Sequence, residues 1–316
     1  MQEPLAVLRS GCKINLFLLI GEKLANGYHS LESLFLPLSE PYDLLEVHAA
    51  PRGSGIAVSF SSRSGGEKMQ TEIAPAGSNT LTKAWNAYAK ISGFKPDIAV
   101  RVAKAVPAGG GLGGGSANGA ALLRWLQASA KEHGREPLSE MDLHKAALAV
   151  GADVPFFLLN SPALASGVGQ KLVPCPVSFP DTHVVLVCPD LAVHTAWGFE
   201  ALDAKRASLG KLPGNEKKSA LSILTSEGQQ ARNFLAHAAG YGNDFENVVF
   251  DKYPELQQLH ERLASSGALA ARMSGTGSTL FALYDDEKIA ARATKSLAND
   301  GLNVYMQRLS GVKTGS

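Results

Sequence analysis

Residues 105–123 read AVPAGGGLGGGSANGAALL, and they concentrate glycine where a strand-like run meets a helix-like run. Residues 98–106 alternate like a half-buried strand, whereas residues 116–131 carry apolar side chains at helical spacing. Glycine weakens both kinds of element, so its use here needs another explanation. A bare backbone that opens a helix directs several N–H groups and the positive end of the helix dipole toward one point. We therefore predict an anion-binding loop rather than a flexible linker or a tight turn.

Three familiar phosphate-binding loops do not account for this stretch. A Walker loop ends in Gly-Lys-Ser/Thr, but Gly115 is followed by Ser-Ala. The string G-x-G-x-x-G begins at Gly109, yet the dinucleotide fold needs a second strand with an acidic residue ~20 positions later, and here more helix follows. The HRD and DFG triplets of protein kinases do not occur in the sequence. The loop alone thus predicts an anion site of unspecified type.

Length and composition indicate a globular protein of about two domains. The chain has 316 residues, of which 45% are hydrophobic and 19% charged. Its net charge is +1 and no long basic run occurs, so we expect no nucleic-acid partner. The N-terminus carries neither a signal-peptide pattern nor an apolar run of spanning length, so we expect no membrane partner and a cytoplasmic location. The 3 cysteines form no C-x-x-C pair and fit buried, inert thiols in a reducing compartment.

The pattern of elements changes near Pro174. Upstream, apolar periodicity predicts strands over residues 6–20, 44–48, 56–60 and 98–106, and helices over residues 79–91, 116–131 and 139–150. Downstream, it predicts strands over residues 183–187, 270–284 (two, joined at Gly275-Thr-Gly) and 303–309, and helices over residues 194–202, 245–263 (broken near Pro254) and 286–297. The order β–α–β–β–α–β from residue 183 predicts a split βαβ sandwich.

Two charged residues admit a catalytic interpretation beside a structural one. Lys13 in CKINLF shares a strand face with Asn15, and a lysine there lies on the solvent side unless it serves a site. Asp153 in GADVPFF precedes Pro155 and suits the N-cap of a short helix. Its functional alternative is a carboxylate that orients a hydroxyl and takes the proton during phosphoryl transfer. Similarly, MSGTGSTLFAL from Met273 fits either a simple hairpin or a loop that lines a ligand pocket.

Taken together, these motifs resemble those of the GHMP kinases. The family's signature is a Pro-x-x-x-Gly-Leu-Gly loop that opens a helix, and residues 107–113 (PAGGGLG) fit it. The stretches KINLFL, NGYHSLESLF, GADVPFF, NDFENVVFDKYPEL and MSGTGSTLFAL also occur in the order typical of one branch, which phosphorylates a cytidylated methylerythritol. The resemblance runs over about residues 13–283. The glycine loop identifies the family, whereas KINLFL, NGYHSL and GADVPFF identify the branch.

The resemblance implies an α+β fold of two domains. These are an N-terminal ATP-binding α/β domain with a left-handed-crossover-type sheet over residues 1–172, and a C-terminal ferredoxin-like α+β sandwich over residues 173–316, with the active site between them. The implied activity is ATP-dependent phosphorylation of the 2-hydroxyl of 4-diphosphocytidyl-2-C-methyl-D-erythritol, in the non-mevalonate route to isopentenyl diphosphate. ATP is the expected co-substrate and Mg²⁺ is expected to arrive with it. No obligate protein partner is implied.

Site residues are carried over from the family by position. Lys13 and Asp153 match the catalytic pair, in which the carboxylate accepts the hydroxyl proton and the ammonium offsets phosphoryl charge. The positions that match ATP contacts are Asn79, Lys104, Pro107, Ala108, Gly109, Gly110, Gly111, Leu112, Gly113, Gly114, Gly115, Ser116 and Ala117. The positions that match substrate contacts are Asn15, Tyr28, His29, Thr195 and Phe199. We expect cytosine to stack between Tyr28 and Phe199 while His29 bonds its polar edge.

Two positions depart from the family's pattern. Ala117 and Gly119 stand where the family usually has serine and alanine. The missing hydroxyl at Ala117 removes one phosphate or Mg²⁺ contact, but the backbone donors are unaffected. Glycine also replaces a serine that other members use near magnesium, so no protein metal ligand is predicted. The polar residues 205–234 match nothing in the family.

Overall fold

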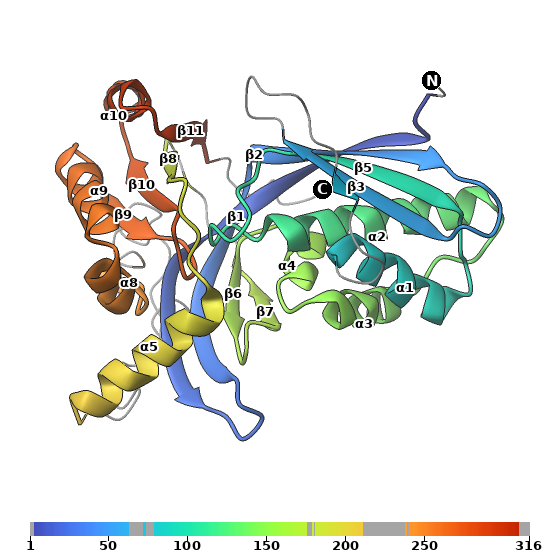
Figure 1. Cartoon of the computed structure of the whole chain (residues 1–316), viewed down its shortest axis with the longest axis horizontal. Helices are drawn as coiled ribbons and strands as arrows, with labels where there is room; N and C mark the ends of the chain where they lie inside the picture. Colours follow the sequence, from blue (N-terminus) through green and yellow to red (C-terminus); the bar gives the residue numbers. More distant parts are fainter. Residues whose placement is uncertain are drawn as a thin grey trace. The chain divides into compact units, whose positions relative to one another are not determined.

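The computed structural model describes residues 3–62, 72–73, 79–175, 179, 181–210, 238 and 240–309. The chain divides into two compact units that interleave along the sequence. Unit 1 comprises Met1–Cys12, Pro41–Pro107 and Gly113–Asn160, and unit 2 comprises Lys13–Glu40, Ala108–Leu112 and Ser161–Ser316. Figure 1 labels the elements of both units. Most of residues 205–234, the polar segment that matches nothing in the family, lie outside the described part of the chain.

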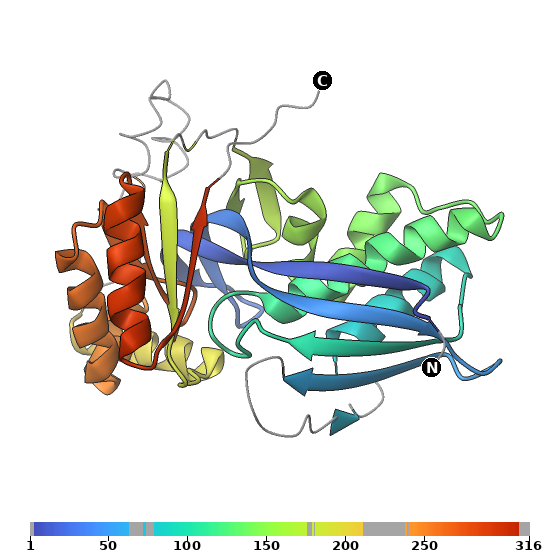
Figure 2. The same cartoon turned by 90° about the horizontal axis from the view of Figure 1, so that it is seen from above.

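Unit 1 is a sheet covered by helices. Its strands are the first part of β1 (Ala6–Lys23), the second part of β2 (His29–Ala49), β3 (Ile56–Ser62), β4 (Glu72–Ile73) and β5 (Ile98–Lys104), and its helices are α1 (Thr80–Ser92), α2 (Gly114–Glu132), α3 (Glu140–Val150) and α4 (Val154–Leu159). Strand β3 runs parallel to β5, whereas β2 runs antiparallel to β5 with Leu44 opposite Ala103. Figure 2 shows the helices on one face of these strands. The predicted α/β layer is therefore confirmed.

Two helices of unit 1, α1 and α3, begin at residues whose side chains cap them. Asn79 caps α1 by accepting a hydrogen bond from the N–H of Thr82 at 2.9 Å. Ser139 caps α3 in the same way through the N–H of Asp142. Helix α2 differs, because Gly113 in the left-handed region occupies its N-cap position and no side chain caps it. The first turn of α2 therefore keeps its N–H groups clear of side-chain caps.

Unit 2 contains a four-stranded antiparallel sheet in the order β11-β8-β10-β9. The elements are β8 (His183–Cys188), α5 (Thr195–Ser208), α8 (Glu246–Lys252), α9 (Pro254–Ser265), β9 (Ala270–Met273), β10 (Leu280–Tyr284), α10 (Glu287–Asn299) and β11 (Asn303–Arg308). Figure 2 shows α9 and α10 on one face of this sheet, over a core of buried aliphatic side chains. The predicted split βαβ sandwich and the helix break at Pro254 are confirmed.

Several strands differ from their sequence-based bounds. Strand β2 runs unbroken for 21 residues, although Pro37 and Pro41 interrupt its pattern and a separate strand over residues 44–48 was expected. Proline cannot donate to a ladder, but it is tolerated where its nitrogen faces away from a partner. Strands β6 (Ala163–Ser166) and β7 (Lys171–Pro174), which continue from the first part of β2 in unit 2, were not predicted because each is only 4 residues long. No helix in the described part of the chain is long and apolar enough to cross a membrane.

Candidate active site

The second half of the glycine loop, in unit 1, forms the start of α2. Gly113 has φ of 70°, and a Cβ on Gly114 would lie 2.7 Å from Cγ1 of Val106, so larger residues would push the helix away from β5. The hydroxyl of Thr80 donates to the carbonyl of Gly115 at 2.8 Å and ties this turn to α1. The uncapped N–H groups and the helix dipole make the start of α2 suited to an anion.

A buried carboxylate fixes the approach to this turn. Asp43 is fully buried and accepts hydrogen bonds from the N–H groups of Ala105 and Val106 at 2.8 and 2.9 Å. Its other oxygen accepts from Nδ2 of Asn118 at 3.0 Å and forms an ion pair with Lys104. One side chain therefore joins β2, the end of β5 and the body of α2. Asp43 was not predicted from the sequence, although an acidic residue in the apolar stretch YDLLEV indicates a buried partner.

The first half of the glycine loop, in unit 2, is held by its carbonyl groups. Gly111 has φ of 78°, and a Cβ there would lie only 2.0 Å from the carbonyl oxygen of Ser274. The hydroxyl of Ser274 donates to the carbonyl of Gly111 at 2.9 Å, and the N–H of Thr279 donates to that of Gly110 at 3.2 Å. The MSGTGSTLFAL stretch is therefore a hairpin between β9 and β10 whose turn also supports the glycine loop.

The segment that begins at Asn243 holds that hairpin turn in place. Nδ2 of Asn243 donates to the carbonyls of Met273 and Gly275 at 2.7 and 2.8 Å. Oε1 of Glu246 accepts from the N–H of Met273 at 2.8 Å, and burial raises the pKa of this carboxyl above its ordinary value. The NDFE residues thus act as a polar brace of the turn, a role that sequence reasoning did not assign.

Lys13 is buried rather than exposed to solvent. Its side chain lies in the part of β1 where residues 12–18 are all buried, and only 4% of Lys13 is accessible. The ammonium donates to Oδ1 of Asn15 and lies 5.1 Å from the ring centre of Phe35. The solvent-facing alternative for Lys13 is therefore wrong. A buried ammonium requires polar partners, which favours the interpretation as a site residue.

Asn15 connects the lysine to the surrounding backbone. Its Nδ2 donates to the hydroxyl of Ser33 at 2.9 Å, and its own N–H donates to the hydroxyl of Ser274 at 3.2 Å. The N–H of Lys13 donates to the carbonyl of Leu112 at 2.9 Å. The structure therefore brings Lys13, Asn15 and the first half of the glycine loop together within unit 2.

Asp153 occupies the N-cap position of α4 but does not cap it. Its backbone is in the right-handed helical region, and its side chain accepts no capping hydrogen bond. Pro155 lies in the first turn, as the sequence predicts. Asp153 thus stands at the predicted N-cap position, but the predicted side-chain cap is absent. Asp153 belongs to unit 1 and Lys13 to unit 2, and their action as a pair stays a prediction.

Asn79 and Lys104, two of the predicted ATP contacts, have different surroundings in unit 1. Nδ2 of Asn79 is buried and lacks a hydrogen-bond partner among the described residues, while its Oδ1 caps α1. An unpaired buried donor is costly, so a ligand acceptor would fit there. Lys104, by contrast, is engaged by Asp43 and retains an exposed fraction of 25%. Through its ion pair with Asp43, Lys104 therefore stabilises the loop in addition to being a candidate nucleotide contact.

The residues expected to bind the base lie around α5 in unit 2. The rings of His29 and Phe199 stack with centres 4.9 Å apart and planes 16° apart, and Phe199 meets Phe245 edge-on. Nε2 of His29 lies 2.8 Å from Oδ1 of Asp203. Tyr28 is 66% exposed, and the hydroxyl of Thr195 lies 3.2 Å from that of Thr276. The ring of His29 thus covers one face of Phe199, the residue on which the base was expected to stack.

Family models and relatives identify the family of this chain. A model described as the GHMP kinases N terminal domain matches residues 79–161, and one described as GHMP kinases C terminal matches residues 228–302. The chain is 39% identical to 4-diphosphocytidyl-2-C-methyl-D-erythritol kinase of Oleidesulfovibrio alaskensis over 97% of this chain and 99% of that one. It is 40% identical to the enzyme of the same name from Nitratidesulfovibrio vulgaris, over 96% and 98% of the two chains.

Solved structures show the same similarity. A crystal structure of 4-(cytidine 5'-diphospho)-2C-methyl-D-erythritol kinase matches with a TM-score of 0.70 and 29% identity, over 97% of this chain and 100% of that one. Homoserine kinase from Cytophaga hutchinsonii matches with a TM-score of 0.66 at 15% identity, over 98% and 97% of the two chains. At that identity the second match concerns the fold alone.

Proposed function

The chain belongs to the GHMP kinases, and within them to the 4-diphosphocytidyl-2-C-methyl-D-erythritol kinases, and we propose that it transfers the γ-phosphoryl group of ATP to the 2-hydroxyl of 4-diphosphocytidyl-2-C-methyl-D-erythritol. The products are the 2-phosphate and ADP, in the non-mevalonate synthesis of isopentenyl diphosphate. The observation that carries this proposal is the uncapped start of α2, where Gly113 in the left-handed region opens the helix toward an anion.

ATP is the phosphoryl donor, and we assign its contacts to the glycine loop and its neighbours. The phosphates are held by residues 107–117, because the N–H groups at the start of α2 lack side-chain caps. Asn79 offers the adenine an unpaired Nδ2 donor. Lys104 stabilises the loop through Asp43 and adds positive charge beside it.

The chemical step needs a proton acceptor and charge stabilisation. We assign the first to Asp153, which matches the catalytic carboxylate of the family by its position in GADVPFF. We assign the second to Lys13, a buried ammonium held by Asn15. Such an ammonium would offset the charge of the phosphoryl group in transit.

The cytidylated half of the substrate is assigned to unit 2. His29 and Phe199 form a stacked pair that offers an aromatic surface and a polar edge to a pyrimidine. Tyr28, at the start of β2 and largely exposed, would cover the base from its other side. Asn15 and Thr195 supply polar contacts to the rest of the substrate.

Mg²⁺ is proposed to enter with ATP rather than to occupy a site of protein ligands. In the described ranges no group of three or more His, Cys, Asp or Glu side chains could hold a metal ion. When bound, the ion would neutralise part of the charge of the phosphates held by the glycine loop. We also propose a division of the chain at residues 172 and 173, a cytoplasmic location, and no obligate partner among proteins, nucleic acids or membranes.

The test is an assay of the purified protein with ATP, Mg²⁺ and the cytidylated methylerythritol, with the new phosphomonoester followed by ³¹P NMR. Homoserine and mevalonate serve as competing alcohol acceptors. Formation of ADP that does not depend on the cytidylated substrate would overturn the assignment, as would preference for either competing alcohol.

A variant pair tests the catalytic role of Asp153. Asp153→Asn should lower kcat by roughly 10²–10⁴-fold while nucleotide binding persists. Asp142→Asn is the matched control, since Asp142 is a carboxylate of the same unit that pairs with Lys145 on the surface of α3. Near-normal turnover of Asp153→Asn would remove its assigned role.

A further inference from the structure

Side chains along one face of helix α5 contact other parts of unit 2, and they include residues beyond the predicted substrate contacts. Thr195, Phe199, Asp203 and Arg206 follow one another at spacings of four, four and three, so they share one face of the helix. Thr195 contacts Thr276, and Phe199 stacks on His29. The next two residues, Asp203 and Arg206, have no place in the sequence-based assignment.

Asp203 contacts both arms of the hairpin formed by β1 and β2. Its Oδ1 lies 2.8 Å from Nε2 of His29, the first residue of β2, and its Oδ2 lies 3.4 Å from Nζ of Lys23, the last residue of β1. The side chain of Lys23 is 60% exposed, so water screens that ion pair and it contributes little. The side chain of His29 is 5% exposed, so its bond to Asp203 is the stronger contact.

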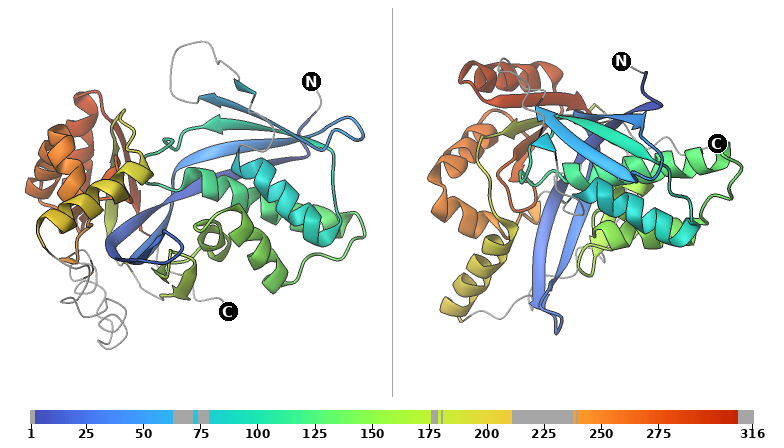
Figure 3. Two further views of the ribbon diagram at one scale, coloured as in Figure 1. Left: turned by 60° about the horizontal axis from the view of Figure 1, so that its bottom comes forward. Right: turned by 45° about the vertical axis from the view of Figure 1, so that its right-hand side comes forward.

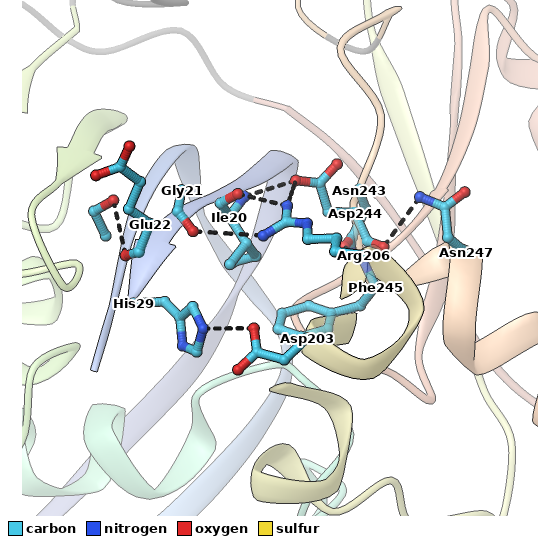
Figure 4. A network of polar contacts seen from close by, with 11 residues as sticks. Ile20, Gly21, Glu22, His29, Asp203, Arg206, Asn243, Asp244, Phe245 and Asn247 are labelled. Atoms are coloured by element: carbon cyan, nitrogen blue, oxygen red, sulfur yellow. Dashed lines mark hydrogen bonds and ion pairs between the residues drawn. The ribbon is translucent and has the colours of Figure 1, made fainter. Parts of the chain in front are cut away.

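Arg206 fixes α5 to the same hairpin one turn further along. Its guanidinium donates to the carbonyl of Ile20 at 2.6 Å and pairs with Asp244 at 3.1 Å. Asp244 in turn accepts from the N–H of Ile20 at 2.8 Å. Figure 4 shows these contacts beside the bond between His29 and Asp203, and Figure 3 shows α5 next to the hairpin. The distance between His29 and Asp203 is therefore set by the backbone anchors as well as by the two side chains.

The partner of Nε2 determines where His29 carries its proton. An ionised carboxylate only accepts hydrogen bonds, so Nε2 must carry the hydrogen. In the neutral ring Nδ1 is then an acceptor. Cytosine presents an amino donor at N4, whereas uracil presents a carbonyl acceptor at the same position. An acceptor at Nδ1 would pair with the first base and repel the second.

We propose that Asp203 is a positioning residue that holds His29 in its Nε2–H form against Phe199, and that this form makes the site selective for cytosine over uracil. The inference rests on the proposed function, in which His29 meets the base. The side chain of Asp203 contacts His29 and Lys23, neither of which is assigned to ATP, so we expect Asp203 to act on the base through His29.

The variant Asp203→Asn distinguishes a role in orienting His29 from a role in packing alone. The amide keeps the shape of the side chain, but it can rotate to donate to Nε2 and so permits a hydrogen on Nδ1. We expect the KM for the cytidylated substrate to rise roughly tenfold, the loss of about one charge-assisted hydrogen bond, with the KM for ATP unchanged. The ratio of kcat/KM for the cytidylated substrate to that for its uridylated analogue should fall by roughly tenfold or more.

Asp251→Asn provides the matched control. Asp251 pairs with Lys205 at 2.7 Å and also ties α5 to a neighbouring element, but it lies away from His29 on an exposed surface. This variant should leave both KM values and the base preference unchanged. Equal effects of Asp203→Asn and Asp251→Asn would show that Asp203 only anchors the helix, and the proposal would be wrong.

¹⁵N NMR of the histidine rings tests the inference without substrate or turnover. In alkaline solution, where free histidine is neutral, the His29 signals of the unaltered protein should show Nε2–H, and Asp203→Asn should weaken that preference. The His29 signal is the one missing from the spectrum of His29→Asn, and if that signal shows Nδ1–H in the unaltered protein, the proposal is wrong. If Nε2–H is found but the cytidylated substrate is not phosphorylated, the proposed function fails and the arrangement of His29 and Asp203 stands.

Discussion

The substitution Asp43→Asn is the sharpest test of how the glycine loop is held. One oxygen of Asp43 accepts from the N–H groups of Ala105 and Val106, and the other accepts from Asn118 and Lys104. An amide retains a single oxygen. Whichever way it turns, its NH₂ group faces two donors, so two of the four interactions are lost in either orientation.

The cost follows from the burial of the carboxylate. If the amide oxygen stays with the backbone, the ammonium of Lys104 loses its buried partner, and breaking a buried ion pair costs about 3–5 kcal/mol. The side chain of Lys104 is 25% exposed and regains some hydration, which places the loss near the lower limit. If the amide turns, two buried N–H groups lose their acceptor at about 1–3 kcal/mol each. Both orientations therefore predict a loss of about 3 kcal/mol.

The functional effect should fall on ATP. Ala105 and Val106 lead directly into the loop, so Asp43→Asn should raise the KM for ATP more than the KM for the cytidylated alcohol. Urea unfolding followed by circular dichroism measures the free energy of unfolding, and steady-state kinetics measures both KM values. Asp97→Asn is the control, since Asp97 accepts from the N–H groups of Gly53 and Gly55 at 2.8 and 2.7 Å in a solvent-accessible turn of the same unit. If the two variants were equally stable with equal KM values for ATP, the reasoning would be refuted.

Three further predictions concern backbone geometry and buried groups. Gly111→Ala should abolish activity and destabilise the chain, because a Cβ at residue 111 would lie 2.0 Å from a backbone oxygen. Gly134 also has a positive φ, of 67°, but no atom lies close to it, so Gly134→Ala should lower the free energy of unfolding in urea by only about 1–2 kcal/mol. Burial raises the pKa of Glu246 above its ordinary value of 4.5, so its contribution to stability is full below that pH and is lost as the pH rises. In urea titrations, Glu246→Gln should therefore gain stability relative to the unaltered protein as the pH rises above 4.5, and a difference that stays constant with pH would contradict this sign. Burial also raises the pKa of Cys175 and Cys188 to about 11. At pH 8 an aromatic disulfide reagent should therefore label these thiols roughly 100-fold more slowly in the native protein than in the protein unfolded in urea. Rapid labelling of the native protein would show that the thiols are not buried.

The elements that sequence predicts well are those fixed by neighbouring residues. The N-cap of α1 at Asn79 and that of α3 at Ser139 depend on hydrogen bonds three residues away, and the break between α8 and α9 depends on Pro254 alone. Asp43 and Asp203 escaped prediction because their partners are distant in sequence. Asp43 lies 61 residues from Lys104, and Asp203 lies 174 residues from His29. A carboxylate shows by its type that it needs a donor, but not which donor the fold supplies.

The environment of Lys13 was misjudged for a different reason. Alternation along a strand assigns one face to solvent, and by that rule Lys13 and Asn15 faced outward. The rule holds for sheets with one solvated face, whereas residues 12–18 of β1 are buried on both faces. The resemblance to the GHMP kinases supplied what periodicity could not, because a motif marks a residue irrespective of how its strand is covered.

In the glycine loop, the carbonyl groups anchor the backbone, whereas the N–H groups at the start of α2 have no side-chain cap. Three successive carbonyls, those of Gly110, Gly111 and Leu112, accept hydrogen bonds from Thr279, Ser274 and Lys13. In the following turn Gly113 leaves the N–H groups of α2 without a side-chain cap. Glycine is needed at residue 111 because the backbone of Ser274 approaches too closely for any side chain, not because the loop must flex. A loop anchored in this way would lose little conformational entropy on binding an anion, so more of the binding energy would remain for positioning the triphosphate that we propose it binds.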